Sequence, residues 1–542
     1  MVSVRNLTLS FGKRTLFEEV NLSFSEGNCY GIIGANGAGK TTFLKVLIGE
    51  MEASKGTIEI TKGQRMSVLQ QNQNAFDEHS VINTVMLGNK KMFEVMVERD
   101  AIYAKEDFTE ADGMRAGELE GEFGEMGGYT AESDAGVLLK EMGLPDEYHS
   151  MQMADVPANL KVKILLAQAL FGNPDILVMD EPTNNLDLAT IGWLENFLAD
   201  YQNIVLVVSH DRHFLDAVCT HVADVDKGKI NIHTGNYSFW YESSQLVSRQ
   251  QNDKNKKTED KRKELLEFIA RFSANASKSK QATSRKKALE KLNVEEIVSS
   301  SRRYPGIFFK PLREPGNQVL EIEKLGFEVD GKKVFNNITL QINKTDKIGI
   351  VSRDKRAVTG FMEIINGVEP NYTGSFSWGT TISKAYLPNE HDPFFAEKNT
   401  NLLDWLRNYV PPHITDADEP FIRGFYGRML FGGDDINKKV GVLSGGEKVR
   451  CLTSRMMLQD PNCIILDEPT AHLDLESIQS FNEGVVNFNG IVFISSQDHT
   501  FMHSVCNRII ELTPNGAIDR LATFDEYLED TRVKELQEEL YV

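Results

Sequence analysis

The stretch Gly34-Ala35-Asn36-Gly37-Ala38-Gly39-Lys40-Thr41 matches GxxxxGK followed by Ser or Thr, the pattern of a phosphate-binding loop. The apolar run from Tyr30 to Ile33 precedes it and a helical pattern from Lys40 to Leu47 follows, giving the strand, loop and helix that the pattern requires. Glycines let backbone N–H groups wrap around a phosphate, Lys40 can reach the β- and γ-phosphates, and Thr41 can help to hold Mg²⁺. These residues predict an α/β nucleotide-binding fold of the phosphate-loop class.

Other chemically active side chains fall at the ends of predicted strands. The apolar run Ile176 to Met179 predicts a strand that places Asp180 where it can bind Mg²⁺. Glu181, the next residue, can polarise an attacking water. His210 follows the apolar run Ile204 to Val208, where it can contact the γ-phosphate; a purely structural histidine is the alternative. Phe11 precedes the phosphate loop, so its ring can stack on adenine, although a core phenylalanine would fit the pattern too.

The chain contains two copies of one unit. The segment Asp175 to Asp187 recurs as Asn462 to Asp474, at an offset of 287 residues, whereas Lys40 aligns with Val358 at an offset of 318. The first half therefore carries about 31 extra residues, a figure that follows from these two offsets. The acidic stretch 91–130, with 11 Asp/Glu and 4 Lys/Arg, is the predicted insertion. We expect a projecting helical arm there, with a solvated surface insertion as the alternative.

The sequence between the two copies is basic. Residues 249–303 hold 16 Lys/Arg against 8 Asp/Glu, although the whole chain has a net charge of −20. The spacing of apolar residues favours a helix over 249–271, a small polar tip and a returning helix over 282–294, rather than a flexible tether. The predicted domains are a first cassette over 1–240, a basic helical linker over 241–316, and a second cassette over 317–542.

The stretch Leu443-Ser444-Gly445-Gly446-Glu447 supplies a last element, a helix N-terminus that offers N–H groups to an anion. With the phosphate loop and the Asp-Glu strand, it resembles the ATPase cassette of the ABC superfamily. The resemblance implies that two cassettes pack head to tail, with each ATP between the phosphate loop of one and the Leu-Ser-Gly-Gly turn of the other. It also implies a role for Gln71, at the position of the glutamine that follows an early strand.

On this resemblance the first site is complete. The implied ATP-binding residues are Phe11, Gly34, Asn36, Gly37, Gly39, Lys40, Thr41, Thr42, Gln71, Asp180, Ser444, Gly445 and Gly446. The implied metal ligands are Thr41, Gln71 and Asp180, and the implied catalytic residues are Glu181, His210 and Lys40. The implied cofactors are ATP and Mg²⁺.

The second site is degenerate in both contributing halves. Its phosphate loop reads 352–359 without glycines, and Val358 replaces the lysine. The positions that correspond to Gln71, His210 and Phe11 hold Asn389, Gln497 and Val329. In place of Leu-Ser-Gly-Gly, the first half offers Val156-Pro157-Ala158-Asn159 to this site. Only Asp467 and Glu468 remain. We expect a single hydrolytic site, with Lys355 and Arg356 as fixed positive charges in the empty phosphate space.

Tandem cassettes joined by a basic helical linker resemble the ABC-F family of translation factors, and the linker segment 271–287 resembles its YbiT-type branch. The resemblance implies an α/β fold with two phosphate-loop cassettes in tandem, joined by a long helical hairpin, which forms an intramolecular cassette dimer in a monomer. It implies binding to the ribosomal E-site, with the linker reaching P-site tRNA and rRNA. The implied RNA-binding residues are Lys278, Lys280, Arg285, Lys286 and Lys287.

Length and composition agree with this interpretation. The 542 residues suffice for at least two domains, and no apolar run approaches the ~20 residues that span a bilayer. The N-terminus lacks the apolar core of a signal peptide. Five scattered cysteines without a CxxC pair argue against a disulfide framework or a zinc site and fit a reducing cytosol. The prediction is a cytoplasmic protein without a membrane span.

Three alternatives stay open at this point. The chain can be a fused ATP-binding subunit of a membrane transporter, although such subunits lack a long basic linker. It can be an interaction protein without catalysis, which the intact Glu181 and His210 argue against. It can also be an ABC-F protein that protects the ribosome against an antibiotic, which the sequence does not separate from general control of translation.

Overall fold

The computed structural model describes residues 1–12, 14–184, 186–272, 284, 286, 289, 302–329 and 331–541. The chain divides into two compact units, Met1–Ser209 with Phe214–Ser301 and His210–His213 with Arg302–Val542. We call them the first and the second cassette. None of the helices within the described ranges is both long and apolar enough to cross a membrane.

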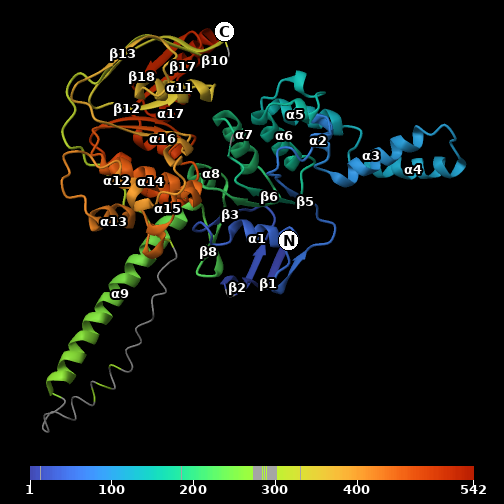
Figure 1. The fold of residues 1–542 in the computed structure, drawn as a ribbon. Coiled ribbons are helices and arrows are strands. Elements are labelled where there is room, and N and C mark those ends of the chain that lie inside the picture. Colours follow the sequence, from blue (N-terminus) through green and yellow to red (C-terminus); the bar gives the residue numbers. More distant parts are fainter. Residues whose placement is uncertain are drawn as a thin grey trace. The chain divides into compact units, whose positions relative to one another are not determined.

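The first cassette is built on a largely parallel sheet with the strand order β5-β6-β7-β3-β8-β9, in which only β9 runs antiparallel to its neighbour (Figure 1). A separate antiparallel sheet has the order β2-β1-β4. The strands are β1 Val2–Phe11, β2 Arg14–Phe24, β3 Cys29–Ile33, β4 Lys55–Ile60, β5 Met66–Val68, β6 Ile176–Asp180, β7 Ile204–Val208, β8 His221–Asp226 and β9 Lys229–Thr234. Strands β3 and β7 are wholly buried, which explains their continuous apolar sequence.

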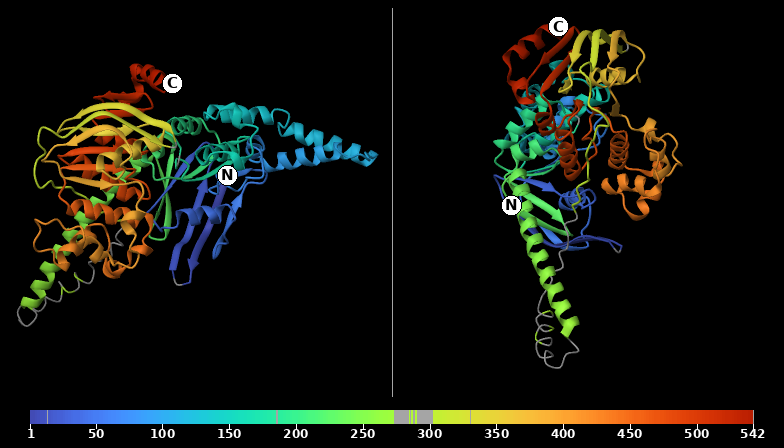
Figure 2. Two further views of the ribbon diagram at one scale, coloured as in Figure 1. Left: turned by 45° about the horizontal axis from the view of Figure 1, so that its top comes forward. Right: turned by 90° about the vertical axis from the view of Figure 1, so that its left-hand side faces the viewer.

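Helices of the first cassette follow its strands and form its arm. They are α1 Lys40–Leu47, α2 Val81–Met86, α3 Lys90–Tyr103, α4 Glu110–Glu125, α5 Ala131–Glu141, α6 Ala158–Leu170, α7 Leu188–Ala199, α8 Arg212–Val218 and α9 Tyr237–Phe272. Short 3₁₀ helices span Asp146–Tyr148 and Met153–Asp155. Helix α9 is continuous over 36 residues and includes the basic segment 249–271 (Figure 2).

The acidic insertion contains α3 and α4, which lie side by side and project from the first cassette (Figures 1 and 2). Thr109 caps α4, and α4 buries Leu119 and Phe123 although it contains four glycines. The guanidinium carbon of Arg99 on α3 lies 4.1 Å from the ring centroid of Phe123. Arg115 on α4 forms an ion pair with Glu98 at 2.9 Å. The two helices are therefore held together by apolar, cation–π and charged contacts.

The second cassette repeats this topology. Its sheets have the orders β14-β15-β16-β12-β17-β18 and β11-β10-β13. The strands are β10 Leu320–Val329, β11 Lys332–Ile342, β12 Lys347–Val351, β13 Thr373–Trp378, β14 Lys384–Leu387, β15 Cys463–Asp467, β16 Ile491–Ser495, β17 Arg508–Thr513 and β18 Gly516–Arg520. The predicted α/β fold with two cassettes in tandem is confirmed.

Helices of the second cassette follow the order of those in the first, except that α3 and α4 of the arm have no counterpart and one helix is added at the C-terminal end. They are α11 Lys355–Asn366, α12 Leu402–Arg407, α13 Glu419–Arg428, α14 Gly445–Leu458, α15 Leu475–Val486, α16 His499–Val505, α17 Phe524–Glu529 and α18 Thr531–Leu540. Short 3₁₀ helices span Asp392–Phe395, Gly433–Asn437 and Val440–Val442. The predicted tip and returning helix of the linker lie outside the described residues, apart from Ser284, Lys286 and Leu289.

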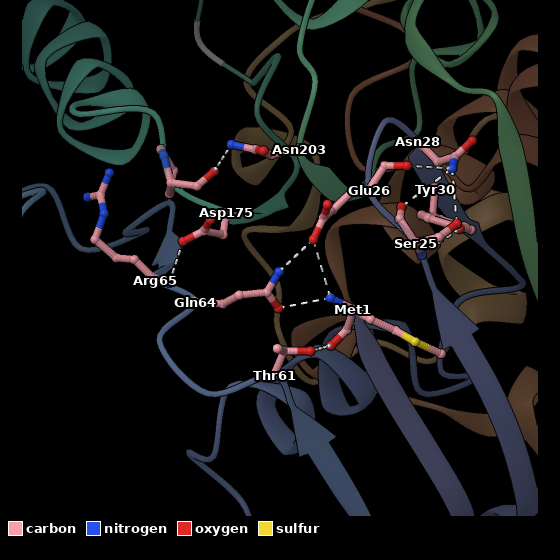
Figure 3. A network of polar contacts seen from close by, with 11 residues as sticks. Met1, Ser25, Glu26, Asn28, Tyr30, Thr61, Gln64, Arg65, Asp175 and Asn203 are labelled. Carbon is pink, nitrogen blue, oxygen red and sulfur yellow. Dashed lines mark hydrogen bonds and ion pairs between the residues drawn. The ribbon is translucent and has the colours of Figure 1, made fainter.

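Polar contacts tie together the amino-terminal ends of the strands in the first cassette (Figure 3). The Arg65 amide donates to the Asp175 carboxylate at 2.7 Å, linking the starts of β5 and β6. The Gln64 side chain donates to Glu26 at 2.9 Å, and the N-terminal amine donates to Gln64 at 2.9 Å. This edge of the sheet is occupied by the protein's own hydrogen bonds. The opposite edge, where β3 and β6 end, carries the residues predicted to bind nucleotide.

Candidate nucleotide sites

The first phosphate loop has the backbone shape of an anion-binding cradle. Gly34, Gly37 and Gly39 have φ values of 156°, 77° and 104°, in the region that favours glycine. A Cβ atom on Gly34 would lie 2.6 Å from the carbonyl oxygen of Val225, so only glycine fits there. Helix α1 begins directly after Gly39, so the N–H groups of its first turn and its dipole face the loop. The loop therefore has the geometry to bind phosphate.

Lys40 lies within this cradle. Its side chain is buried, with 8% of the residue exposed, and its Nζ donates to the carbonyl oxygen of Gly34 at 2.7 Å. A buried ammonium group needs such partners, because burial without them is unfavourable. The carbonyl contact keeps the charge beside the loop backbone, where an anionic phosphate would meet it.

Two of the predicted metal ligands lie together at the end of β6. The Gln71 amide nitrogen donates to the Asp180 carboxylate at 3.2 Å. Thr41, the third predicted ligand, is the second residue of α1 and is exposed. Hydroxyl, amide and carboxylate oxygens are the ligands that Mg²⁺ prefers, so the chemistry of this set fits the ion.

Glu181 turns sharply out of the sheet. Its φ is 55°, unusual for a residue other than glycine, and its amide donates to the carbonyl oxygen of Val208 at 2.8 Å. That bond continues the pairing of β6 with β7 by one residue. Glu181 is therefore held in a fixed position at the carboxyl edge of the sheet, next to Asp180.

A purely structural role is the alternative for both Phe11 and His210, and the structure decides it only for Phe11. Phe11 ends β1 and is 52% exposed, which excludes the alternative of a core phenylalanine. His210 follows Ser209 after β7, in the short segment 210–213 that is grouped with the second cassette. Its contribution to the first site remains a prediction.

In the second cassette, the segment that aligns with the phosphate loop forms the start of a helix. Helix α11 begins at Lys355, three residues before Val358, which aligns with the first residue of α1. None of residues 352–358, all of which the structure describes, has a positive φ. The part of the chain that would wrap a phosphate has become the first turn of a helix.

An acidic side chain of the protein itself occupies the anion position at this helix end. Asp354 is the N-cap of α11 and accepts a hydrogen bond from the Arg356 amide at 3.0 Å. The Arg356 guanidinium forms an ion pair with the same carboxylate at 2.7 Å and holds the pKa of Asp354 below its usual range. The predicted positive charge of Arg356 is thus neutralised, and a bound phosphate would meet a carboxylate.

The C-terminal residues also cover the second loop. The Arg353 amide donates to the Tyr541 hydroxyl at 3.1 Å, and the guanidinium carbon lies 4.1 Å from the centroid of the Tyr541 ring. The Tyr541 hydroxyl in turn donates to Glu511 at 2.8 Å. A tyrosine side chain therefore packs on the backbone that a nucleotide would need.

Of the two surviving acids of the second cassette, Asp467 is buried and Glu468 is partly buried at the surface. Thr359 donates to the Asp467 carboxylate at 2.9 Å, and the Gln497 amide donates to Glu468 at 3.2 Å. Burial raises the pKa of Asp467 to about 6 and that of Glu468 to about 7, while the nearby charge of Lys355 opposes both shifts. The protein's own groups satisfy these carboxylates.

The Leu-Ser-Gly-Gly turn is intact in the second cassette and absent from the first. Ser444 caps α14 in a capping box with Glu447, and Glu447 accepts from the Ser444 amide at 2.8 Å. A Cβ atom on Gly446 would lie 2.7 Å from the carbonyl oxygen of His472, so glycine is required. At the matching place in the first cassette, Pro157 precedes α6 and its side chain makes no cap.

The predicted RNA-binding residues are mostly beyond what the structure describes. Lys278, Lys280, Arg285 and Lys287 lie outside the described residues, whereas Lys286 is helical and exposed. Sequence reasoning missed Asp354 and Tyr541. An aspartate before a helical pattern is an N-cap signal and could have revealed the first. No local signal marks the second.

Comparisons with known proteins identify the class that this fold and these loops define. Two family models, both described as ABC transporter, match residues 17–184 and 223–308. The fold resembles that of an archaeal ribosome recycling factor, aABCE1, solved in complex with the ribosomal stalk protein aP1. The TM-score is 0.60, at 16% identity, over 99% of this chain and 98% of that chain. The chain consists of ATP-binding cassettes of the ABC type and is an ATPase.

Two relatives show which family this chain belongs to. The chain is 53% identical to YkpA, an ABC transporter ATP-binding protein of Bacillus subtilis, over 100% of both chains. It is 40% identical to YbiT, a probable ATP-binding protein of Escherichia coli O157:H7, over 97% of this chain and 99% of that one. The chain belongs to the ABC-F family and to its YbiT-type branch, as its motifs and linker predict.

Proposed function

We propose that this chain is a ribosome-binding ABC-F ATPase that controls translation in the cytoplasm through a single ATP site. The observation that carries the proposal is the contrast between the two phosphate loops. The first has three glycines with positive φ around a buried Lys40. The second is a helical turn capped by Asp354 and covered by Tyr541.

In this proposal the site is shared between the two cassettes. Lys40 and the backbone of the first loop bind the β- and γ-phosphates, and Ser444 with its two glycines binds the γ-phosphate from the other cassette. Mg²⁺ held by Thr41, Gln71 and Asp180 would neutralise charge on the phosphates. Because the γ-phosphate touches both cassettes, it favours their closed state over the open state.

Hydrolysis then reverses closure. Glu181, fixed at the end of β6, polarises the attacking water, and His210 contacts the γ-phosphate. Loss of the γ-phosphate removes the contact that distinguishes the closed state, so the cassettes separate. The second pair of surfaces acts as a scaffold without turnover.

Three observations support the ribosome as the partner. The chain belongs to the ABC-F family, and its linker region 249–303 carries 16 Lys/Arg against 8 Asp/Glu in a chain of net charge −20. A solved protein with the same tandem fold is a ribosome recycling factor. Basic side chains on a helical linker suit phosphate contacts with rRNA and tRNA, and such contacts weaken as salt rises.

The test is sucrose-gradient sedimentation of full-length Glu181→Gln protein with ATP and ribosomes. We expect the variant to remain ATP-bound and to migrate with ribosomes, and to dissociate as the salt concentration increases. Adding Lys40→Ala should abolish co-migration, whereas the matched variant Glu468→Gln should behave as the unmodified protein. Failure of Glu181→Gln to reach the ribosome fractions at low salt would refute the proposed partner and favour the transporter-subunit alternative.

A further inference from the structure

A groove of about 630 Å³ opens on the first cassette, away from the phosphate loop. It is lined by the start of α3, by α5, and by the ends of α6 and α7. Helices α5, α6 and α7 gather beside the base of the arm (Figure 1). We call it the α5–α7 groove. Its volume falls within the range of ~300–1,000 Å³ that is typical of ligand pockets.

One wall of the groove is aromatic. Trp193, Phe197 and Tyr201 recur every four residues along α7 and just beyond its end, with ring centroids 5.2 Å and 5.8 Å apart. Phe197 and Tyr201 line the groove and are only partly buried. The Tyr201 hydroxyl donates to the carbonyl oxygen of Pro174 at 2.6 Å, which fixes its ring. Rigid aromatic rings of this kind suit an apolar anchor.

The opposite wall adds exposed aliphatic surface. Val137 on α5 is 54% exposed, and Leu138 beside it is partly buried. Both side chains line the groove. Apolar groups from α5 and α7 therefore face a space that the cassette does not fill with its own side chains.

The rim of the groove is acidic. Asp134, Glu141 and Asp200 line it and are exposed, and no lysine or arginine is among its lining residues within the described part of the chain. None of these three carboxylates forms an ion pair with any residue that the structure describes. Three negative charges around an apolar floor attract a cationic ligand and repel phosphate. A nucleotide or an RNA strand is therefore a poor occupant.

We propose that the α5–α7 groove docks a basic amphipathic peptide segment of a partner protein, with an apolar side chain against Phe197 and Tyr201 and lysine or arginine side chains at the three carboxylates. A helix with apolar residues every three or four positions presents such a pair of faces. The site goes beyond the proposed function, because it involves neither ATP nor the basic linker.

The test measures binding of a fluorescein-labelled 14-residue peptide, made of lysine and leucine at helical spacing, to the full-length protein by anisotropy. The variant Asp134→Asn/Glu141→Gln/Asp200→Asn should weaken binding about tenfold, because it removes three charge pairs that each contribute modestly at an exposed surface. Val137→Ser should weaken it several-fold through lost apolar contact. A peptide of equal charge with serine in place of leucine should bind more weakly than the leucine peptide.

The matched control removes three charges elsewhere. Glu106→Gln/Asp107→Asn/Glu110→Gln changes exposed acids from the α3–α4 connection to the first residue of α4, outside the groove, and should alter binding less than twofold. Equal weakening by both triple variants, or displacement of the peptide by a uridine oligonucleotide, would overturn the proposal. ATPase activity should be unchanged in every variant. The peptide assay contains no ribosomes, so its outcome is separate from that of the sedimentation test.

Discussion

The two phosphate loops lie in the same place in the same fold, between the central strand of a parallel sheet and the helix that follows it. In the first cassette, glycines with positive φ keep the chain open until α1 begins at Lys40. In the second cassette, α11 begins three residues earlier in the alignment, at Lys355. The helical form also places Ala357 and Val358 in the hydrophobic core of the second cassette, where both are buried.

The comparison shows what replaces a lost ligand. A helix N-terminus leaves N–H groups without partners, and an anion commonly satisfies them. In the first cassette this role is open to a phosphate. In the second, Asp354 supplies the anion and Tyr541 bonds the backbone of Arg353. The second loop is a closed structural element whose polar groups no longer require a nucleotide.

The largest expected effect separates the two glutamates that follow β6 and β15. Glu181→Gln should lower the rate of ATP hydrolysis about a hundredfold or more, since it removes the group that we propose polarises the attacking water. Glu468→Gln should change it less than twofold. Steady-state phosphate release measures both, and the opposite ranking would show that the second cassette carries the activity.

A second pair of variants compares the loops themselves. Gly39→Ala should weaken ATP binding about tenfold, because φ is 104° there and an alanine is strained by roughly 1–2 kcal/mol or more. The added Cβ has room, with its nearest atom 3.5 Å away on Leu16, so the effect reports on backbone geometry. Ala357→Gly at the aligned position should leave ATP binding unchanged. Titration calorimetry distinguishes these outcomes, and equal affinities would contradict the cradle.

Tyr541, whose side chain packs on the second phosphate loop, should contribute to stability and not to ATP turnover. Tyr541→Ala removes a ring packed on Arg353 and the hydroxyl bonds to Glu511 and the loop, and we expect a loss of about 2 kcal/mol in the unfolding free energy of the second cassette. Tyr541→Phe keeps the ring and should lose about half as much. Urea unfolding followed alongside ATPase activity tests this. A marked fall in ATPase activity with unchanged stability would assign the tyrosine a different role.

The smallest effect concerns pH. Glu468 has a pKa raised to about 7 by burial, against an ordinary value of 4.5, so the folded state keeps a proton that the unfolded chain releases between these values. The contribution of protonated Glu468 to the free energy of unfolding is fully present below about pH 4.5, and it is lost as the pH rises through 7. Glu468→Gln should therefore raise the unfolding temperature of the second cassette more at pH 8 than at pH 5. An identical increase at both pH values would show that Glu468 does not titrate in this range.

Local patterns predicted the fold and where most of the first cassette's candidate site residues lie. The spacing of three glycines before Lys40 specified the cradle, and the apolar run before Asp180 and Glu181 specified where these acids lie. Each of these features depends on short-range geometry that a single stretch of sequence encodes.

Other features depend on contacts between distant parts of the chain. The bond from Arg353 to Tyr541 joins residues 188 positions apart, and nothing near either residue in sequence announces it. The extended start of α11 depends on the balance between a helical turn and an open loop, which Asp354 shifts toward the helix. The α5–α7 groove arises where α3, α5, α6 and α7 meet, so its shape is a property of packing. For these features the structure was needed.

Nucleotide stoichiometry tests the central claim most directly. Equilibrium dialysis of full-length Glu181→Gln protein against labelled ATP with Mg²⁺ counts bound nucleotides without turnover. We predict one ATP per chain at saturation, and none when Lys40→Ala is added. Two ATP molecules per chain, or one that survives Lys40→Ala, would contradict the account.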